Sequence, residues 1–599
     1  MDKYKKFMYI GIFILLISLV SSAGTYAWFT WISPSNTSVT LSIGNLADVT
    51  FTSGPDINIT NLAPVYNYTD GVSTTFTVRN VNSTDSLLYK VKLEITSIAN
   101  ELKDESFKYT LVKDNKVVKT GNLKDAVNGN TLILNTSSLD KGSTSSPKIS
   151  TFKLYFWIDG NMENNSNMMN KSLVGKIDVG VETNVITNTE SSISSTSKFL
   201  NSEVPRQNIS TLKVVDNLNI PEGATVVDVS KNGDNTIKMW YNEADANGNY
   251  DITIGSNNTI YANPSSTAGL FSNLTNVTSI DLSNMDTSGM TNMANMFSGN
   301  TSLTNITFGD NFNTSNVTSM VSMFGSCSNL KTLNLSMFDT SNVGGMNSMF
   351  YRCSSLKTLD LSNFDTSKLE NTAHMFNGCS SLTTLNLSGF NTSNVTTAWY
   401  MFNGCRSLTS LDVSRFDTSK MTSMQNMFRD CSLLTSLDVS GFDTSNVTNM
   451  DFMFCGCNSL VNIDLSNFDT SKVTSMMGML AGCLSLTSLD LSNFNTSNVT
   501  KMGIGWSGGG MFDNCRSLTS LDLSSFDTSK VTDMTNMFRY TDNLKTIYVS
   551  DLWNVSSVTS SDNMFTGCTS LKGIVPFDSS KTDVSMANYT NGYLTYKKR

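Results

Sequence analysis

Residues 407–431, SLTSLDVSRFDTSKMTSMQNMFRDC, decide the fold of most of this chain, because the same pattern returns again and again. The Met of a Met-Phe pair recurs every 26 residues, at Met323, Met349, Met375, Met401, Met427 and Met453, and Met479 continues the series. Leu270, Met296, Met511, Met537 and Met564 extend it to about twelve units. A fixed period of this length is typical of a solenoid whose units bury their apolar sides against each other.

Two apolar patterns lie within each unit. Leu408, Leu411, Val413 and Phe416 follow a Leu-x-x-Leu-x-Leu-x-x-Phe spacing, which predicts a short strand. The apolar residues after Asp417 follow the spacing i, i+3, i+6, i+7 and i+10, and they are Met421, Met424, Met427, Phe428 and Cys431. This spacing predicts one face of a short helix. We therefore expect residues 270–575 to form an α/β leucine-rich-repeat solenoid of 26-residue units.

The unit resembles a known family. Residues 407–414 (SLTSLDVS), residues 416–419 (FDTS) and Met427-Phe428 are similar to the BspA-like leucine-rich-repeat surface proteins of bacteria, over about residues 225–575. The resemblance implies a noncatalytic binding role at the cell surface, commonly as an adhesin toward host or neighbouring-cell proteins. It does not identify the ligand.

The region 34–188 has a different period. In residues 87–95 the apolar side chains alternate with polar ones, and residues 152–158 and 177–181 repeat this alternation. A period of two predicts half-buried strands, and seven or so short strands separated by turns favour an antiparallel β-sandwich.

The first 33 residues are typical of export. Lys3, Lys5 and Lys6 precede an apolar stretch that runs to about Trp31. This arrangement predicts either a cleaved signal peptide or, because the stretch is long enough to cross a bilayer, an uncleaved membrane anchor. We expect the protein to be extracellular, at the cell surface.

A second resemblance concerns this N-terminal part. Residues 24–30 (GTYAWFT), the strand-like residues 37–44 and residues 157–161 (WIDGN) are similar to TasA/camelysin-like exported proteins of Gram-positive bacteria. The resemblance implies cleavage between Ala27 and Trp28, and some members of that family build extracellular fibres. Residues 157–161 also fit a simpler interpretation, a strand end followed by an Asp-Gly turn.

The remaining boundaries follow from composition. Residues 189–210 are rich in Ser and Thr and predict a flexible linker. Residues 211–269 contain several short strand patterns, and we interpret them as a β-rich N-terminal cap for the first repeat. Residues 576–599 are expected to form a C-terminal cap or tail.

Composition limits the classes of function. A net charge of −9 and a pI near 4.9, without a Lys/Arg stripe, argue against nucleic-acid binding. The chain has one histidine, His374, whereas hydrolytic mechanisms usually recruit at least one His as base or metal ligand. We expect no enzyme activity, no cofactor and no metal, and we interpret His374 as an exposed, solvated side chain.

Two residue types, Cys and Asp, recur at fixed positions of the unit and form columns along the stack that could have a chemical role. Nine of the ten cysteines fall at one position of the unit, where Asn300 and Thr541 replace Cys, and Cys455 lies beside the column. We interpret them as buried free thiols, with disulfides or metal binding as the alternatives. Asp residues such as Asp412 and Asp417 recur on the strand and at the turn. The turn Asp is expected to accept backbone N–H bonds where the helix starts, with calcium binding as the alternative.

Variation between units marks the candidate binding surface. The strand face repeats Ser410, Asp412 and Ser414 almost unchanged, which suits recognition of an irregular partner poorly. The outward positions change more freely and include aromatic and Arg side chains, and residues 501–510 hold a six-residue insertion. Such side chains anchor many interfaces. The candidate binding residues are Trp399, Tyr400, Phe452, Trp506, Arg406 and Arg415.

Two functions remain open at this point. The first is an adhesin-like surface protein whose array binds a host or neighbouring-cell surface or matrix protein or a glycan. The second is a structural matrix or fibre component that self-associates through the TasA-like sandwich. The N-terminal segment allows membrane anchoring in either case.

Overall fold

The computed structural model describes residues 39–43, 46–52, 57–59, 64–80, 87–140, 142–143, 145–162, 165–169, 171–182, 184–186, 193–231, 233–263, 268–505 and 509–598. The predicted signal peptide or anchor, with its Ala27–Trp28 cleavage site, lies outside these residues, as does Trp506. Within them, no helix has the length and apolar character needed to span a bilayer. The chain divides into two compact units, residues 1–182 and 183–599.

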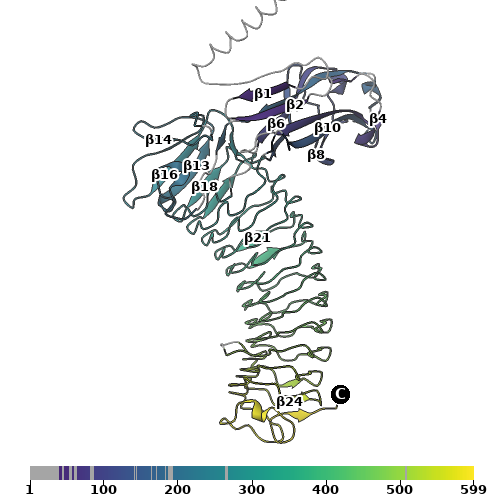
Figure 1. Cartoon of the computed structure of the whole chain (residues 1–599), viewed down its shortest axis with the longest axis vertical. Helices are drawn as coiled ribbons and strands as arrows, with labels where there is room; N and C mark the ends of the chain where they lie inside the picture. The colour runs from purple at the N-terminus through teal and green to yellow at the C-terminus, as the bar shows by residue number, and fades with distance from the viewer. Residues whose placement is uncertain are drawn as a thin grey trace, which may run out of the picture. The chain divides into compact units, whose positions relative to one another are not determined.

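The N-terminal unit contains two β-sheets. The first has the strand order β1-β2-β5-β10-β7-β8, with β4 paired to β10 (Figure 1). Its strands are β1 (Val39–Ile43), β2 (Leu46–Thr52), β4 (Pro64–Val65), β5 (Val72–Asn80), β7 (Phe107–Lys113), β8 (Lys116–Asn122) and β10 (Lys148–Asp159). The second sheet has the order β3-β11-β6-β9, formed by β3 (Ile57–Ile59), β6 (Leu87–Ile98), β9 (Thr131–Leu139) and β11 (Leu173–Val181). Its pairs are antiparallel.

One hydrophobic core joins the two sheets of this unit. The alternation expected for residues 87–95 is present, since Tyr89, Val91, Leu93 and Ile95 on β6 are at most 2% exposed. They share a buried cluster with side chains of the first sheet, including Phe152 on β10. Three short 3-10 turns complete the unit, η1 (Tyr68–Asp70), η2 (Asn100–Leu102) and η3 (Asn165–Met168).

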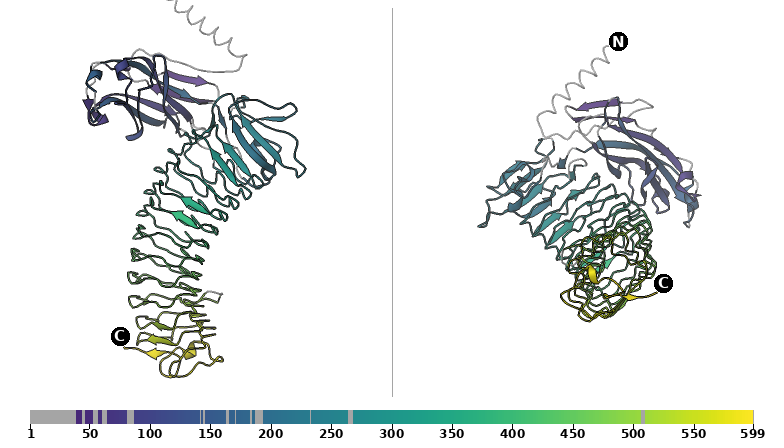
Figure 2. Two further views of the ribbon diagram at one scale, coloured as in Figure 1. Left: turned by 180° about the vertical axis from the view of Figure 1, so that it is seen from behind. Right: turned by 60° about the horizontal axis from the view of Figure 1, so that its bottom comes forward.

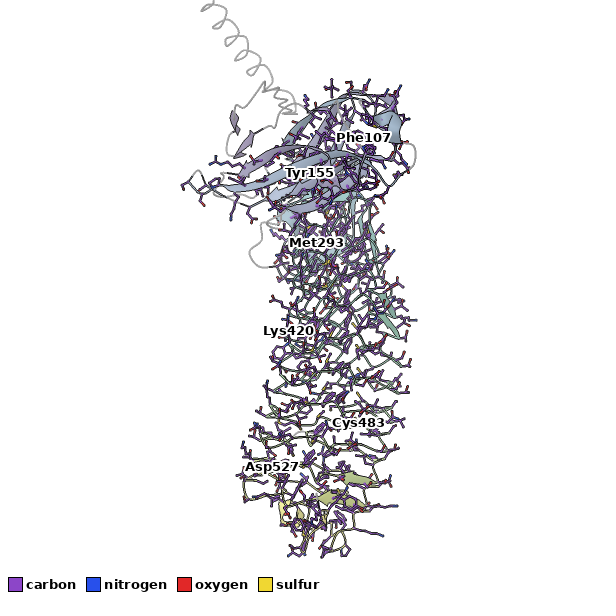
Figure 3. All side chains as sticks on the ribbon, turned by 90° about the vertical axis from the view of Figure 1, so that its right-hand side faces the viewer. Phe107, Tyr155, Met293, Lys420, Cys483 and Asp527 are labelled. Atoms are coloured by element: carbon purple, nitrogen blue, oxygen red, sulfur yellow. The ribbon has the colours of Figure 1, made fainter. Side chains whose placement is uncertain are left out.

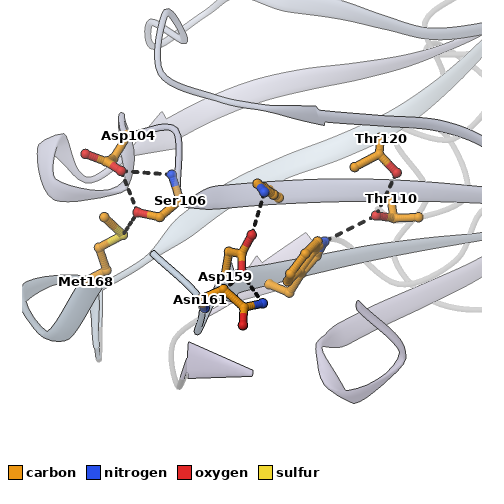
Figure 4. Close-up of polar contacts among 9 residues, drawn as sticks. Asp104, Ser106, Thr110, Thr120, Asp159, Asn161 and Met168 are labelled. Atoms are coloured by element: carbon orange, nitrogen blue, oxygen red, sulfur yellow. Dashed lines mark hydrogen bonds and ion pairs between the residues drawn. The ribbon is translucent and has the colours of Figure 1, made fainter. Parts of the chain in front are cut away.

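The end of β10 forms a polar turn. Asp159 Oδ2 accepts a bond from Lys108 Nζ at 2.5 Å, and its Oδ1 accepts the backbone N–H of Asn161 at 3.0 Å (Figure 4). The indole N–H of Trp157 donates to Thr110 Oγ1 at 3.2 Å. The bond from Lys108 is the main reason that the pKa of Asp159 is lowered. These contacts are those of an Asp-Gly turn closing a strand.

The second unit begins with a mixed sheet that leads into the repeats. Its strand order is β14-β15-β16-β13-β18-β20. The strands are β13 (Ile209–Val215), β14 (Thr225–Asp228), β15 (Lys238–Tyr241), β16 (Tyr250–Gly255), β18 (Ser279–Leu282) and β20 (Asn305–Phe308). A smaller sheet holds β12 (Val185–Ile186), β17 (Ile260–Ala262) and β19 (Met285–Asp286). Because β13 pairs in parallel with β18, the first coil of the array continues this sheet.

Part of the predicted linker is folded into this unit. Residues 193–210 contain η4 (Phe199–Asn201) and η5 (Arg206–Asn208). Phe199 and Val204 are buried in the main core of the second unit, and Arg206 is fully buried. The Ser/Thr-rich composition therefore misled, because the few apolar residues that follow Ser197 determine the packing.

The prediction of an α/β leucine-rich-repeat solenoid is wrong. The described residues contain no α-helix, and each unit is a coil of tight turns whose neighbours stack along one axis (Figures 1 and 2). Short strands occur in some of the later coils, namely β21 (Thr358–Asp360), β22 (Thr384–Asn386), β23 (Ser520–Asp522), β24 (Thr546–Val549) and β25 (Thr595–Tyr596). A 3-10 turn, η6 (Val584–Met586), lies near the C-terminus.

Alternating hydrogen bonds replace the predicted helix. In one coil the N–H of Met401, Asn403 and Cys405 each donate three residues back, to Ala398, Tyr400 and Phe402. The N–H groups between them donate to the next coil, from Phe402 to Met427 O at 2.9 Å and from Gly404 to Arg429 O at 2.7 Å. We call this segment, residues 397–405 in this coil and the equivalent residues of the others, the turn ribbon. Isolated parallel bridges at its start link successive coils from Asn292 to Ser560.

Backbone angles explain why the ribbon is not a helix. In most units the residue before the repeated Met has a positive φ. From Asn295 to Asn563 these φ angles lie between 53° and 62°. A second position four residues later is also left-handed, as at Arg352, Gly404 and Asp430. A right-handed helix cannot pass through two such residues. The apolar spacing was ambiguous because successive turns of three residues also place Met424, Met427, Phe428 and Cys431 on one side.

The interior of the stack is an aromatic and thioether core. Phe324, Phe350, Phe376, Phe402 and Phe428 stack ring on ring, with centroids 5.5 to 5.9 Å apart and planes within 8° of parallel. The Met residues of the ribbon, apart from the partly buried Met477, are fully buried beside them. Offset parallel rings add to the burial energy. Figure 3 shows the side chains along the stack, with Lys420 and Asp527 on one edge.

Both ends of the stack are covered. At the first coil, the buried Arg206 guanidinium donates from Nη1 to Leu270 O and Ser272 O, both at 3.0 Å. At the last coil, the Tyr593 ring packs edge-on against Phe565 at 5.3 Å, and β25 pairs in parallel with β24. Neither end leaves the apolar core open to water.

Candidate functional site

The corner formed by the Asp-Thr-Ser motif is structural. Thr418 Oγ1 donates to Asp443 O of the next coil at 2.9 Å, and Asp417 Oδ1 accepts the N–H of Ser419 at 3.0 Å. The turn Asp thus accepts a backbone N–H as expected, although it caps a turn and not a helix. Equivalent Thr bonds link nearly every pair of neighbouring coils. This buried Thr column was not predicted from the sequence.

Asn-Val-Thr triplets such as residues 394–396 match the acceptor sequence for N-linked glycans, and they belong to the same corner. Asn394 Nδ2 donates to Ser367 O at 2.8 Å, and Asn446 Nδ2 donates to Ser419 O at 2.9 Å. Lys residues of alternate coils add a second bond, as from Lys420 Nζ to Asn394 Oδ1 at 2.7 Å. A glycan on these amides would break the bonds between coils, so stacking explains the triplets.

The cysteine column carries a hydrogen bond that the sequence did not reveal. All ten cysteines are buried free thiols. Cys431 Sγ donates to Phe402 O of the preceding coil at 3.3 Å, and Asn300, which replaces Cys, donates to Phe271 O at 2.8 Å. Burial raises the pKa of Cys431 to about 12. The replacements at this position are side-chain donors, which was the available signal. No group of three His, Cys, Asp or Glu within the described ranges could hold a metal.

The strand-face Asp column is engaged locally. Asp412 Oδ1 accepts from the Ser414 N–H at 3.0 Å and from the Ser414 hydroxyl at 2.7 Å. These bonds from Ser414 hold the pKa of Asp412 below its usual value, and Asp438 behaves in the same way with Ser440. The carboxylates are therefore part of turns and form a uniform, exposed stripe.

An aromatic cluster interrupts this uniformity on the turn ribbon. It consists of Tyr351, His374, Trp399 and Tyr400, from three successive coils. The His374 and Tyr400 rings are stacked, with centroids 4.9 Å apart and planes 17° from parallel. Trp399 lies 6.2 Å from His374 and is 42% exposed, and Tyr351 meets His374 edge-on at 6.1 Å. We call these four residues the aromatic cluster.

His374 lies at the centre of the cluster, so the interpretation of a fully solvated side chain was wrong. Asn377 Nδ2 lies 2.8 Å from His374 Nδ1, and Asn403 Nδ2 donates to Asn377 Oδ1 at 2.8 Å. An amide donor at Nδ1 keeps the proton on Nε2. Partial burial lowers the pKa of His374, which favours the neutral ring at pH 7.

The cluster is built on strained backbone. His374 and Tyr400 have φ angles of 58° and 57°. The equivalent positions of other units hold Asn295, Ser322, Ser348, Asn426, Gly478, Asn536 and Asn563, and in one unit a further ring, Phe452. Asn and Gly tolerate this conformation, whereas a bulky ring there costs of order 1 kcal/mol or more. Such strain, retained at neighbouring coils, is typical of functional sites.

The other predicted binding residues are not part of this cluster. Phe452 is 9% exposed and lies under Arg429, whose guanidinium is 5.1 Å from the ring, so its prediction as an exposed anchor was wrong. Arg415 is exposed and donates to Ser388 O at 3.3 Å, beside the strand face. Arg406 is exposed after the ribbon. Trp506 lies outside the described residues.

Sequence reasoning missed three members of the site. Tyr351 and His374 join Trp399 and Tyr400 because residues one period apart are neighbours in the stack. Arg352 lies 5.0 Å from the Tyr351 ring and is the one cation found against the aromatic cluster in the described structure. Aligning the units on their Met would have placed His374 and Tyr400 in one column.

The comparisons concern the repeat array. A family model described as "Mycoplasma protein of unknown function, DUF285" matches residues 265–384, 354–437, 423–506 and 507–591. No curated protein and no solved structure matches the chain. The four matches together run from residue 265 to residue 591, more than half of the 599 residues, and cover nearly all of the stacked coils. The chain therefore belongs to the DUF285 family.

Proposed function

We propose that this protein is an exported cell-surface protein whose noncatalytic repeat array binds a macromolecular partner through the aromatic cluster. One observation carries the proposal: the exposed Trp399 lies beside Tyr400 and His374, two half-buried rings held on left-handed backbone in consecutive coils. The stack does not need the His374 and Tyr400 rings, because Asn, Ser or Gly fills their column in most other units, and the Trp399 column holds Ala, Val, Asn, Gln or Asp in other units.

The rings of the cluster contribute little to the stability of the fold. A large apolar side chain gains stability from burial, so an exposed Trp beside two strained rings contributes little to folding. Trp and Tyr are also the residues that most often dominate binding energy. The uniform columns of Thr, Asn, Asp and Cys, in contrast, all have bonds that explain their presence.

The cellular part of the proposal rests on the sequence. The basic and apolar first 33 residues support export, and the resemblance of the unit to BspA-like surface proteins supports a place at the cell surface. N-terminal sequencing of the protein recovered from culture medium and from membranes tests this part. A chain that stays in the cytoplasm with residue 1 intact would contradict it.

Binding of the full-length protein to intact bacterial and mammalian cells tests the function itself. We expect Trp399→Ala to weaken binding at least tenfold, while Asp412→Asn and Asp438→Asn leave it unchanged. Circular dichroism of each variant serves as the control for folding. Loss of binding only in the two Asp variants would move the site to the strand face.

A further inference from the structure

The chemistry of the aromatic cluster indicates the class of its partner. We infer that the cluster is a docking surface for an uncharged polysaccharide, with a sugar ring against the exposed Trp399 ring and its hydroxyls beside the edges of the stacked His374 and Tyr400 rings. This inference rests on the proposed function and makes its partner specific.

The first argument is the form of the surface. The rings come from three successive coils, with neighbouring centroids 4.9 to 6.2 Å apart. The stacked His374 and Tyr400 rings cover each other's faces and present their edges, so the ring that offers a surface to a ligand is the exposed Trp399. The axial C–H groups of a pyranose form an apolar face that packs against such a ring.

The polar groups of the cluster also fit a sugar. In the described structure, Trp399 Nε1 and the hydroxyls of Tyr351 and Tyr400 have no hydrogen-bond partner, and His374 Nε2 carries the remaining imidazole proton. Neutral donors and acceptors around apolar ring faces match sugar hydroxyls, which both donate and accept.

The side chains around the cluster are mostly uncharged. Arg352 is the cation at the edge of the cluster, and its guanidinium already lies over the Tyr351 ring. The amides of Asn377 and Asn403 run beneath the rings where other units carry Arg429, Asp513 or Arg539. A protein hot spot usually pairs its aromatic side chains with charged partners at a polar rim. The neutral setting of this cluster favours a neutral glycan over a charged peptide or an anionic polymer.

The binding test uses the full-length chain and three uncharged probes, cellohexaose, chitohexaose and mannohexaose, in isothermal titration calorimetry. We expect at least one probe to bind, and Trp399→Ala and Tyr400→Asn to weaken that binding at least tenfold. Tyr400→Asn places a residue suited to positive φ, so it removes the ring without loss of thermal stability. Tyr540→Asn is the matched control, because Tyr540 is 43% exposed with a φ of 56° and belongs to another coil.

A second arm separates this inference from the proposed function. Cells that bind the protein are treated with periodate, which cleaves sugar diols, or with trypsin. Binding that periodate abolishes and trypsin spares supports the polysaccharide. Binding that trypsin abolishes and periodate spares identifies a protein partner and overturns the inference, while the proposed function stands. Failure of all three probes to bind, or equal binding by the cluster variants, also overturns it. If the cluster variants bind cells as well as the unchanged protein does, the proposed function is overturned.

Discussion

Tyr400 and Phe452 occupy the same place in two units of the array, yet one ring is half-exposed and the other is buried. Each directly precedes the conserved Met, and their φ angles are 57° and 56°. The Tyr400 ring stacks on His374 beside the exposed Trp399. The Phe452 ring instead packs with Cys455 and Ala481 and is 9% exposed. Position in the repeat thus determines the backbone but not the exposure.

The neighbouring column accounts for the difference. Around Tyr400 the residues that follow the conserved Phe are Asn377 and Asn403, whose amides bond to each other and occupy the space beside the ribbon. Around Phe452 the same column supplies Cys455 and Ala481, which are small enough to leave room for a ring. Ile504, at the base of the insertion, and Met477 cover that ring further.

The largest expected effect comes from making the same exchange in both units. Phe452→Asn should lower the free energy of unfolding by about 3 kcal/mol, because it empties a packed aromatic site. Tyr400→Asn should leave stability unchanged or raise it by up to about 1 kcal/mol, because Asn relieves the left-handed strain. Urea unfolding followed by circular dichroism measures both. Equal losses would show that Tyr400 packs as Phe452 does.

A second exchange tests the neighbouring column. Ala481→Asn should cost about 2 kcal/mol, because the added amide has to enter a filled, apolar site next to Phe452. The reciprocal Asn403→Ala should cost less, about 1 kcal/mol, since Asn403 Oδ1 has no donor to lose. The same urea titrations decide. A larger loss for Asn403→Ala would mean that the amides, and not the small residues, hold the ribbon.

A third change concerns a feature that both regions share, the thiol bond between coils. Cys431→Ala should cost about 1 kcal/mol through the lost donor and the small cavity. Cys431→Ser should cost less, because a hydroxyl can keep a bond to Phe402 O, as the polar replacement Asn300 does when it donates to Phe271 O of the preceding coil at 2.8 Å. Thermal unfolding of the two variants side by side gives the order. If Ser is the worse of the two, the apolar character of the thiol matters more than its bond.

The smallest effect is a pH dependence confined to the aromatic cluster. The folded state lowers the pKa of His374, so the unfolded chain binds the proton first as pH falls. The stability contributed by the neutral ring is present above the ordinary His pKa of about 6.5 and is lost as pH drops below it. Comparing unfolding at pH 7.5 and 5.5 should show a loss below about 1 kcal/mol that His374→Asn removes. Persistence of the loss in that variant would assign it to other groups.

Much of the array could be predicted from its period, and the reason is physical. Residues one period apart become neighbours, so Met401, Phe402 and Cys405 had to share an interior with their equivalents, and all three are fully buried. The helix was wrong because consecutive three-residue turns and helical turns place nearly the same residues on one side. The left-handed column contained the missing information, since Asn295, Gly478 and Asn536 favour positive φ.

The candidate site was predicted less completely. Trp399 and Tyr400 stood out because the variable outward positions turn aromatic there, and the structure leaves Trp399 exposed and Tyr400 half-buried. Phe452 departs from the same column, but its exposure depends on the size of Cys455 and Ala481, which no single position reveals. His374 was set apart as the only histidine and judged alone, although its contacts come from the coils before and after it.

The turn ribbon gives the array an electrical direction. Within the ribbon, each N–H that leaves a coil points toward the C-terminus, as from Phe402 to Met427 O, so these dipoles add along the ribbon, whereas beside its start the N–H of Thr422 points back, to Thr396 O. The negative pole lies at the first coil, opposite in sense to an α-helix, and the buried Arg206 cation sits there on Leu270 O and Ser272 O. At the positive pole the last donor, Phe565 N–H, meets Thr582 O at 2.9 Å. Both poles are thus neutralised from within the chain, which allows the number of coils between them to change without a new terminus being needed.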